Sequence, residues 1–228
     1  MSRKRRIGLY GGTFDPVHSG HLEVARQVSQ LFEVETVLFV PAQVAPHKVS
    51  RTVSAPLHRH AMLVLATQDE PRFLISTYEL DAPGRSYTVD TVTHFQRVVG
   101  DSSEIFFIMG ADSWEEIRTW HEWQRLLALV NHIVVTRPGY DIGRAGIGST
   151  LEKRILDLRE RKGPVHSTSE PRIFVTDVAM KDISATEIRR VAGAGRFDQL
   201  TGLVPDAVLE YIKKYRLYRD SNEAEFHS

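Results

Sequence analysis

The sequence contains no cysteine, and this absence excludes several kinds of chemistry at once. Without thiols the chain forms no disulfide, has no thiolate nucleophile, and offers no sulfur ligand to zinc or to an iron–sulfur cluster. An excess of charge of one sign is also missing, because 29 Lys and Arg side chains balance 29 Asp and Glu side chains. No overall field therefore draws the protein to nucleic acid or to an anionic membrane, and phosphate binding has to come from local clusters.

Long hydrophobic runs are absent as well. No run approaches the roughly 20 apolar residues of a membrane span, and the apolar residues 7–10 after the basic start are too few for a signal-peptide core. We therefore expect a soluble, cytoplasmic protein without a membrane partner. A chain of 228 residues is long enough for one sizeable α/β domain with an ample core.

The most informative stretch is residues 11–22, GGTFDPVHSGHL, between a short apolar run and an amphipathic helix. It is neither a GxGxxG motif nor an ATPase P-loop ending in Lys-Ser or Lys-Thr. Gly11 and Gly12 can adopt positive φ and let the backbone approach a ligand, and the following helix would point its free N–H groups and positive dipole end at an anion. His18 and His21 are three residues apart, so both would lie on one helix face. The stretch predicts a polyphosphate site; the alternatives are a partial zinc site, for which cysteine ligands are missing, and two surface histidines.

Strand and helix patterns alternate along the whole chain. Strands are expected at residues 7–10, 37–40, 73–76, 104–109, 131–136 and 172–176, and helices at about 20–32, 54–67, 88–99, 151–161, from 183, and 205–215. A short helix should follow residues 110–113, and a second helical piece should carry Trp120 and Trp123. This alternation predicts an α/β fold, a doubly wound, Rossmann-like parallel sheet with helices on both faces. Ligands bind such sheets at the carboxyl ends of the strands, where the loops after residues 10, 40, 109 and 176 should meet.

We expect residues 1–228 to form a single domain. Its sheet core would span about residues 1–176, a small helical C-terminal part about 177–220, and a frayed tail 221–228. The segment at about 141–171 carries no motif that assigns it a role.

Several motifs together resemble one family. They are GGTFDPVHSGH, PHK (46–48), SYTVDT (86–91), GADSW (110–114), TWHEW (119–123), RPGY (137–140), ISATEIRR (183–190) and VPDAVLEYIKKYRLY (204–218). The first motif and ISATEIRR are typical of the HxGH nucleotidyltransferase superfamily. SYTVDT, with the GAD and Trp segments, is similar to the bacterial nicotinate-nucleotide adenylyltransferases.

The resemblance implies a transferase of NAD (pyridine nucleotide) biosynthesis. AMP would pass from ATP to nicotinate mononucleotide, giving deamido-NAD and pyrophosphate, by direct attack of the 5′-phosphate on the α-phosphorus. Such chemistry depends on alignment and charge neutralisation and needs no covalent enzyme intermediate. Mg²⁺ bound with ATP is implied as the cofactor, although the sequence shows no dedicated metal cage.

The family's site residues map onto matching positions. The expected catalytic residues are His18, His21, Lys48 and Arg189. The expected ATP-binding residues are Gly11, Gly12, Thr13, Phe14, His18, His21, Ser184, Thr186 and Arg189, and bound triphosphate would favour the cationic forms of the two histidines. The expected nicotinate-nucleotide-binding residues are Lys48, Tyr87, Thr88, Asp112 and Trp120.

Some of these residues also have a plain structural interpretation. Tyr87 and Thr88 begin a helix, so their N–H groups could seat the nicotinate carboxylate, and Trp120 would stack on the pyridine ring or be a core residue. Ser184 followed by Glu187 is also an ordinary capping box. Asp112 would hold either the ribose or the metal-bound phosphates.

Other functions stay open at this point. The acceptor could be nicotinamide mononucleotide or phosphopantetheine, or the chain could be a nucleotide-binding regulator that does not catalyse. A nucleic-acid partner is disfavoured because the charge is balanced and no reader motif is present. The sequence leaves the oligomeric state open, including a homo-oligomer.

Overall fold

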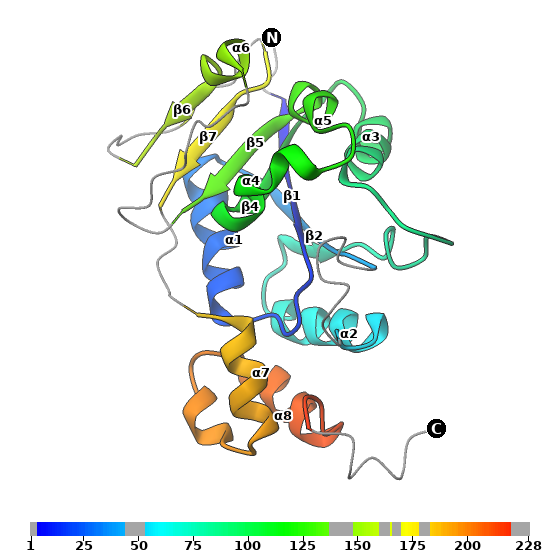
Figure 1. The fold of residues 1–228 in the computed structure, drawn as a ribbon, viewed down its shortest axis with the longest axis vertical. Coiled ribbons are helices and arrows are strands. Elements are labelled where there is room, and N and C mark those ends of the chain that lie inside the picture. The colour runs from blue at the N-terminus through cyan, green and yellow to red at the C-terminus, as the bar shows by residue number, and fades with distance from the viewer. Residues whose placement is uncertain are drawn as a thin grey trace.

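A parallel β-sheet forms the centre of the molecule (Figure 1). The computed structural model describes residues 4–43, 53–136, 148–159, 165, 170–177 and 183–219. Within them seven strands pair in the order β3-β2-β1-β4-β5-β7-β6, and every pairing is parallel. The strands are β1 (Arg5–Gly12), β2 (Thr36–Pro41), β3 (Phe73–Ile75), β4 (Ser103–Gly110), β5 (Asn131–Val135), β6 (Ile155–Asp157) and β7 (Ile173–Thr176).

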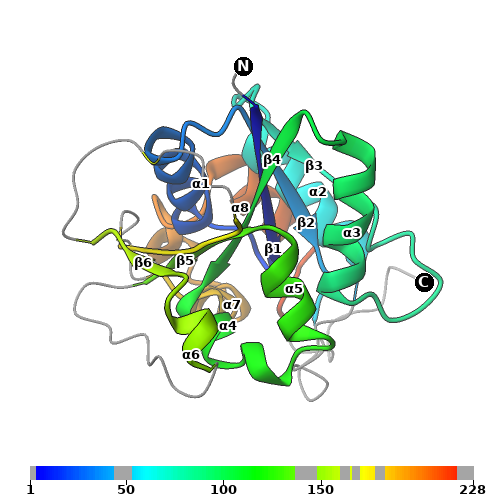
Figure 2. The ribbon, with the colours of Figure 1, turned by 90° about the horizontal axis from the view of Figure 1, so that it is seen from above.

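Helices cover both faces of this sheet (Figure 2). The helices are α1 (Ser19–Leu31), α2 (Pro56–Thr67), α3 (Thr88–Val99), α4 (Ala111–Glu115), α5 (Trp123–Leu129), α6 (Ser149–Glu152), α7 (Ala185–Gly193) and α8 (Asp206–Lys214), with two 3₁₀ turns, η1 (Ile117–Thr119) and η2 (Phe197–Leu200). One hydrophobic cluster joins the sheet to α1, α2, α7 and α8, and another joins it to α3, α4 and α5. The predicted doubly wound α/β fold is confirmed.

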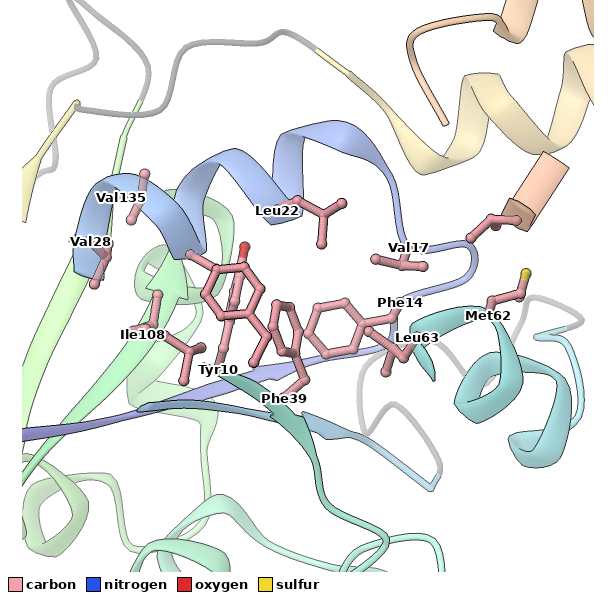
Figure 3. Packing of buried hydrophobic residues seen from close by; sticks show 14 of the residues in the cluster. Tyr10, Phe14, Val17, Leu22, Val28, Phe39, Met62, Leu63, Ile108 and Val135 are labelled. Carbon is pink, nitrogen blue, oxygen red and sulfur yellow. The ribbon is translucent and has the colours of Figure 1, made fainter. Parts of the chain in front are cut away.

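The central strands are buried on both sides, which explains their continuous apolar sequence. In β1, Leu9 packs in the cluster under α3 and α5, whereas its neighbour Tyr10 packs in the cluster under α1 and α2. The ring of Tyr10 lies 5.5 Å from that of Phe14 and 5.4 Å from that of Phe39, centroid to centroid (Figure 3). This aromatic group fixes the end of β1 and the loop that follows it.

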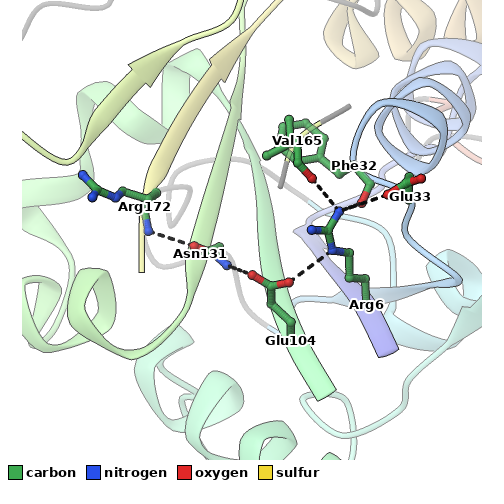
Figure 4. Close-up of polar contacts among 7 residues, drawn as sticks. All are labelled: Arg6, Phe32, Glu33, Glu104, Asn131, Val165 and Arg172. Atoms are coloured by element: carbon green, nitrogen blue, oxygen red, sulfur yellow. Dashed lines mark hydrogen bonds and ion pairs between the residues drawn. The ribbon is translucent and has the colours of Figure 1, made fainter. Parts of the chain in front are cut away.

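A polar network joins four strands at their amino ends (Figure 4). The buried guanidinium of Arg6 pairs with Glu104 at 3.1 Å and donates from Nη1 to the carbonyls of Phe32 and Val165. The Asn131 amide donates to the other Glu104 oxygen and accepts from the Arg172 N–H, both at 2.8 Å. The network therefore links β1, β4, β5 and the residue before β7, at the end of the sheet opposite the candidate site.

Two sequence predictions are wrong. The helix expected at 151–161 ends at Glu152, and Ile155 and Leu156 instead pair with β7 as an edge strand. Pairing with a distant strand has outweighed local propensity here. Trp120 and Trp123 do not share a helical piece either, because Trp120 has extended backbone after η1 and α5 begins only at Trp123.

Some predicted features lie outside the described residues. These are the PHK and RPGY motifs, most of the segment 141–171, and the tail 221–228. Within the described part, no helix is both long and apolar enough to cross a membrane.

Candidate active site

A cavity of about 470 Å³ opens at the carboxyl ends of the central strands. Gly11 and Gly12 from β1, Val40 from β2 and Met109 from β4 form its floor, as predicted for a doubly wound sheet. The loop after β7 should join them, but its residues 178–182 lie outside the described residues. The other residues that line the cavity are Thr13, Ala42, Glu79, Arg85, Tyr87, Thr88, Thr91, Phe107, Ser113, Glu116, Thr119, Trp120 and His121.

The two glycines at the end of β1 serve a different purpose from the one expected. Neither adopts positive φ; the left-handed residue of this loop is Phe14, at φ 51°. A Cβ on Gly12 would come within 2.9 Å of the Phe14 ring, and a Cβ on Gly11 within 3.1 Å of the Phe107 ring. The glycines therefore make room for two aromatic rings, and the ring of Phe107 belongs to a residue that lines the cavity.

His18 and His21 lie together at the start of α1. Their rings are tilted by 31°, with centroids 3.7 Å apart, and the backbone N–H of His18 donates to Nδ1 of His21 at 3.2 Å. Burial lowers the pKa of His18 to about 4, so its imidazole is neutral at pH 7 in the free protein. The shared face predicted from the spacing is present, with His18 as the N-cap of the helix.

The first turn of α1 is not entirely free to bind an anion. The N–H of Ser19 donates to the carbonyl of Leu203 at 2.9 Å, and the Ser19 hydroxyl donates to the carbonyl of Gly202 at 3.0 Å. The segment between η2 and α8 thus occupies the Ser19 amide, so this N–H is not free to bind phosphate.

The start of α3 lies on the opposite side of the cavity. Tyr87 is the N-cap and Thr88 the first helical residue, and both line the cavity. The Tyr87 ring lies 4.3 Å from the ring of His121, and the Trp120 ring meets Phe107 edge-on at 6.4 Å. The N-terminus of α3 therefore shares the cavity with aromatic side chains. Its first amides have no intrahelical partner. Tyr87, Thr88 and Trp120 lie together, as the motifs suggested.

Helix α7 contacts the loop after β1. Ser184 caps the helix by accepting from the Glu187 N–H at 3.5 Å, whereas the Glu187 carboxylate pairs with Arg190, so the structure shows the N-cap half of the expected capping box. Arg189 reaches further: its Nη1 donates to the Asp15 carbonyl at 2.7 Å and its Nη2 to Thr186 Oγ1 at 3.2 Å. These contacts place the ISATEIRR helix next to the GGTFDP loop, although none of its residues lines the cavity.

Several predicted ligands do not line the cavity, and these include Phe14, His18, His21, Ser184, Thr186 and Arg189. Asp112 is exposed in α4 and is not among the lining residues; its neighbour Ser113 is. Lys48 lies outside the described residues. Among the residues that the structure describes, no group of three or more His, Asp or Glu side chains could hold a metal ion.

Sequence reasoning missed several charged or titratable residues in the cavity. His121 belongs to the TWHEW motif but had no role, and Arg85 and Glu116 lie outside the quoted motifs. Glu79 carried no sequence signal; it accepts from the Thr91 hydroxyl at 2.7 Å, and burial raises the pKa of its carboxyl.

Comparison with known proteins agrees with this geometry. A family model described as cytidylyltransferase-like matches residues 9–191. A curated relative from Thermoanaerobacter sp. (strain X514), named a probable nicotinate-nucleotide adenylyltransferase, is 39% identical over 223 residues, which are 98% of this chain and 99% of the relative. A relative of the same description from Symbiobacterium thermophilum is 40% identical over 213 residues, 93% of this chain and 95% of its own.

A solved structure shares the fold. The nicotinic acid mononucleotide adenylyltransferase of Plasmodium falciparum, complexed with NaAD, superposes with a TM-score of 0.69 at 19% identity, covering 94% of this chain and 97% of that one. The sequence motifs, the cavity at the strand ends and these full-length relatives lead to one conclusion: the chain belongs to the nicotinate-nucleotide adenylyltransferases, within the cytidylyltransferase-like family.

Proposed function

We propose that this protein transfers AMP from ATP to nicotinate mononucleotide, giving deamido-NAD and pyrophosphate. The observation that carries the proposal is the cavity, which has the start of α3 and Trp120 on one side and the end of β1 on the other. Relatives that match the full chain carry the name of this activity. The acceptor would bind in the cavity and ATP on the side of α1 and α7.

The reaction is a single displacement. An oxygen of the acceptor's 5′-phosphate attacks the α-phosphorus of ATP, and the bond from that phosphorus to the bridging oxygen breaks, so pyrophosphate leaves. The protein supplies alignment and charge, because no bond to an enzyme side chain forms.

The nucleotide half of the site rests on the end of β1 and the start of α1. The backbone of residues 11–14 would line the triphosphate, and His18 and His21 would bind the phosphate oxygens on which charge develops. Because burial lowers the pKa of His18 to about 4, its positive charge would form only when the triphosphate is present. Arg189, held near Asp15, with Ser184 and Thr186, would approach from α7, and Lys48 is proposed as a further phosphate ligand.

Mg²⁺ is proposed to enter with ATP. The described residues include no cluster of three metal ligands, and this fits an ion held mainly by phosphate oxygens. When bound, it would neutralise charge on the triphosphate. The chain's own contribution is the row of N–H and imidazole donors.

The pyridine half rests on α3. The first amides of α3, at Tyr87 and Thr88, would receive the nicotinate carboxylate, because a helix N-terminus favours an anion. Trp120 would pack on the ring. The carboxamide of nicotinamide mononucleotide would bring N–H donors to a site that itself offers donors. We therefore expect the protein to prefer nicotinate mononucleotide. Asp112 stays a candidate for the ribose from outside the cavity.

The test is pyrophosphate release from ATP and Mg²⁺, with nicotinate and nicotinamide mononucleotides supplied in parallel and phosphopantetheine as a third acceptor. We expect release with the nicotinate compound and a preference for it of about fivefold or more, since a mismatched buried polar group costs about 1–3 kcal/mol. Equal use of acid and amide would contradict the carboxylate seat alone. No release with any acceptor, despite ATP binding, would overturn the function.

A further inference from the structure

A buried polar cluster lies beneath the phosphate loop, the name used here for residues 11–18. Asp15 is 4% exposed and Arg59 only 1%, and neither carries a ligand contact in the proposed reaction. The Asp15 carboxylate accepts from the Tyr218 hydroxyl at 2.8 Å through Oδ1 and from the Ser54 N–H at 3.1 Å through Oδ2. Both oxygens are thus fixed by groups from distant parts of the chain.

Arg59 supports the same loop from α2. Its guanidinium donates to three carbonyl oxygens, at 2.9 Å to Thr13, 3.2 Å to Gln43 and 3.1 Å to Ser54. Burial lowers the pKa of Arg59, and the negative charge of Asp15 opposes that effect. A guanidinium keeps its proton in proteins, so Asp15 also balances a buried charge, and losing its orientation would affect more than one hydrogen bond.

The backbone of Asp15 belongs to the cluster as well. Its carbonyl accepts from Arg189, the α7 residue proposed to bind phosphate, at 2.7 Å. One residue of the phosphate loop therefore connects α7 through its backbone and Tyr218, four residues beyond α8, through its side chain.

Tyr218 is itself held in place. Its backbone packs so closely on α7 that a Cβ on Gly193 would lie 2.5 Å from the Tyr218 carbonyl oxygen. Burial raises the pKa of the Tyr218 phenol, and the nearby Asp15 charge raises it further. The hydroxyl thus stays protonated and can only donate to the carboxylate.

We propose that Tyr218 is a positioning residue: by orienting Asp15, it fixes the phosphate loop and Arg189 for catalysis. The proposal rests on the proposed function in assigning ATP to this side of the site. Tyr218 does not line the cavity. Its hydroxyl acts through Asp15, and a loop displaced by about 1 Å can lower a rate by up to about 100-fold.

The chain offers a matched control at Tyr211. Its hydroxyl lies 2.9 Å from Nδ1 of His58 in α2, so this hydrogen bond also joins the C-terminal part to the rest of the fold. The Tyr211 hydroxyl does not touch the phosphate loop. Tyr218→Phe and Tyr211→Phe therefore each remove one oxygen and one short hydrogen bond; Tyr218→Phe also removes a long contact, at 4.0 Å, to Sδ of Met62. A purely structural role predicts similar results for both.

The experiment compares the two variants in steady-state kinetics and in amide hydrogen exchange. We expect Tyr218→Phe to lower kcat/KM for ATP at least about tenfold, with KM for nicotinate mononucleotide unchanged, because the pyridine half is separate. Exchange of the amides of residues 11–18 should be faster than in the wild type. Tyr211→Phe should leave both quantities near their wild-type values.

Gly193→Ala provides a second variant with an intact hydroxyl. Alanine favours the helix by about 1 kcal/mol, yet its methyl group would push against the Tyr218 backbone, so we expect a loss of kcat/KM for ATP despite the better helix former. Equal kinetics and equal exchange in Tyr218→Phe and Tyr211→Phe would overturn the proposal. If the wild type releases no pyrophosphate, the proposed function fails, and the exchange comparison alone still decides whether Tyr218 fixes the loop.

Discussion

His18 is subject to two opposing influences. Burial and its position at the positive end of α1 both disfavour its cation, and burial lowers its pKa to about 4. A bound triphosphate has the opposite effect, because several negative charges within a few ångströms favour the protonated ring. Binding of ATP would therefore change the charge of His18 in the proposed ATP site.

This balance predicts that ATP binding takes up a proton. At pH 7, calorimetric titrations in two buffers of different ionisation enthalpy should show net uptake of up to about one proton per ATP. His18→Asn should lose most of that uptake, whereas Tyr211→Phe should keep it. Identical uptake in the wild type and His18→Asn would show that His18 stays neutral in the complex.

At the scale of single elements, local signals and distant contacts contribute differently. Helix α3 was predicted with both ends correct, since a polar start and the stop at Gly100, at φ 64°, are local features. Strand β6 was missed because the residues near Ile155 carry no signal that announces their pairing with β7. The other edge strand, β3, also pairs over only three residues, yet the apolar run that begins at Phe73 predicted it.

The candidate site divides in the same way. Tyr87, Thr88, His18 and His21 carry motif signals and lie where those motifs implied. Contacts over long sequence separations were not predictable, including those of Asp15 with Ser54, 39 residues away, and with Arg189, 174 residues away. The roles of the predicted ligands stay predictions until ligands are bound.

The network at the amino ends of the strands leads to a prediction about stability. Asn131→Ala would remove the hydrogen bonds that the amide donates to Glu104 and accepts from the Arg172 N–H, at a partly buried position. We expect a loss of about 2–3 kcal/mol in the free energy of unfolding by urea, with kcat unchanged because the cavity is at the other end of the sheet. Gln124→Ala, at an exposed position in α5, is the control and should change stability by less than about 0.5 kcal/mol. A loss of activity without a loss of stability would contradict this separation.

For the whole molecule, buried histidines make stability sensitive to acid. His132 is 0% exposed in β5, and burial lowers its pKa to about 3, whereas an unfolded chain has the ordinary value near 6.5. Between these two pH values the unfolded chain binds a proton that the folded chain does not. The free energy of unfolding therefore falls as the pH falls, by up to about 1.4 kcal/mol per pH unit for each such histidine. His18 adds to the effect between about pH 6.5 and 4.

The corresponding test replaces His132 by an apolar residue. Between pH 7 and 4.5, His132→Leu should lose about 2–3 kcal/mol less stability than the wild type, measured by urea unfolding at each pH. His121→Leu, at a side chain that is 49% exposed, should follow the wild-type pH dependence. Parallel curves for the wild type and His132→Leu would rule out His132 as a source of the acid sensitivity.

The phosphate loop lies near the start of the chain, yet its supports come from the end. Ser19 is bonded to Gly202 and Leu203, and Asp15 to Arg189 and Tyr218. During synthesis, N-terminal segments emerge and begin to fold first, so β1 and α1 leave the ribosome long before these partners exist. The phosphate loop therefore gains these supports only after residues 189–218 have been synthesised. A chain that stopped before Tyr218 would keep the strands of the sheet but lack the hydrogen bond that orients Asp15.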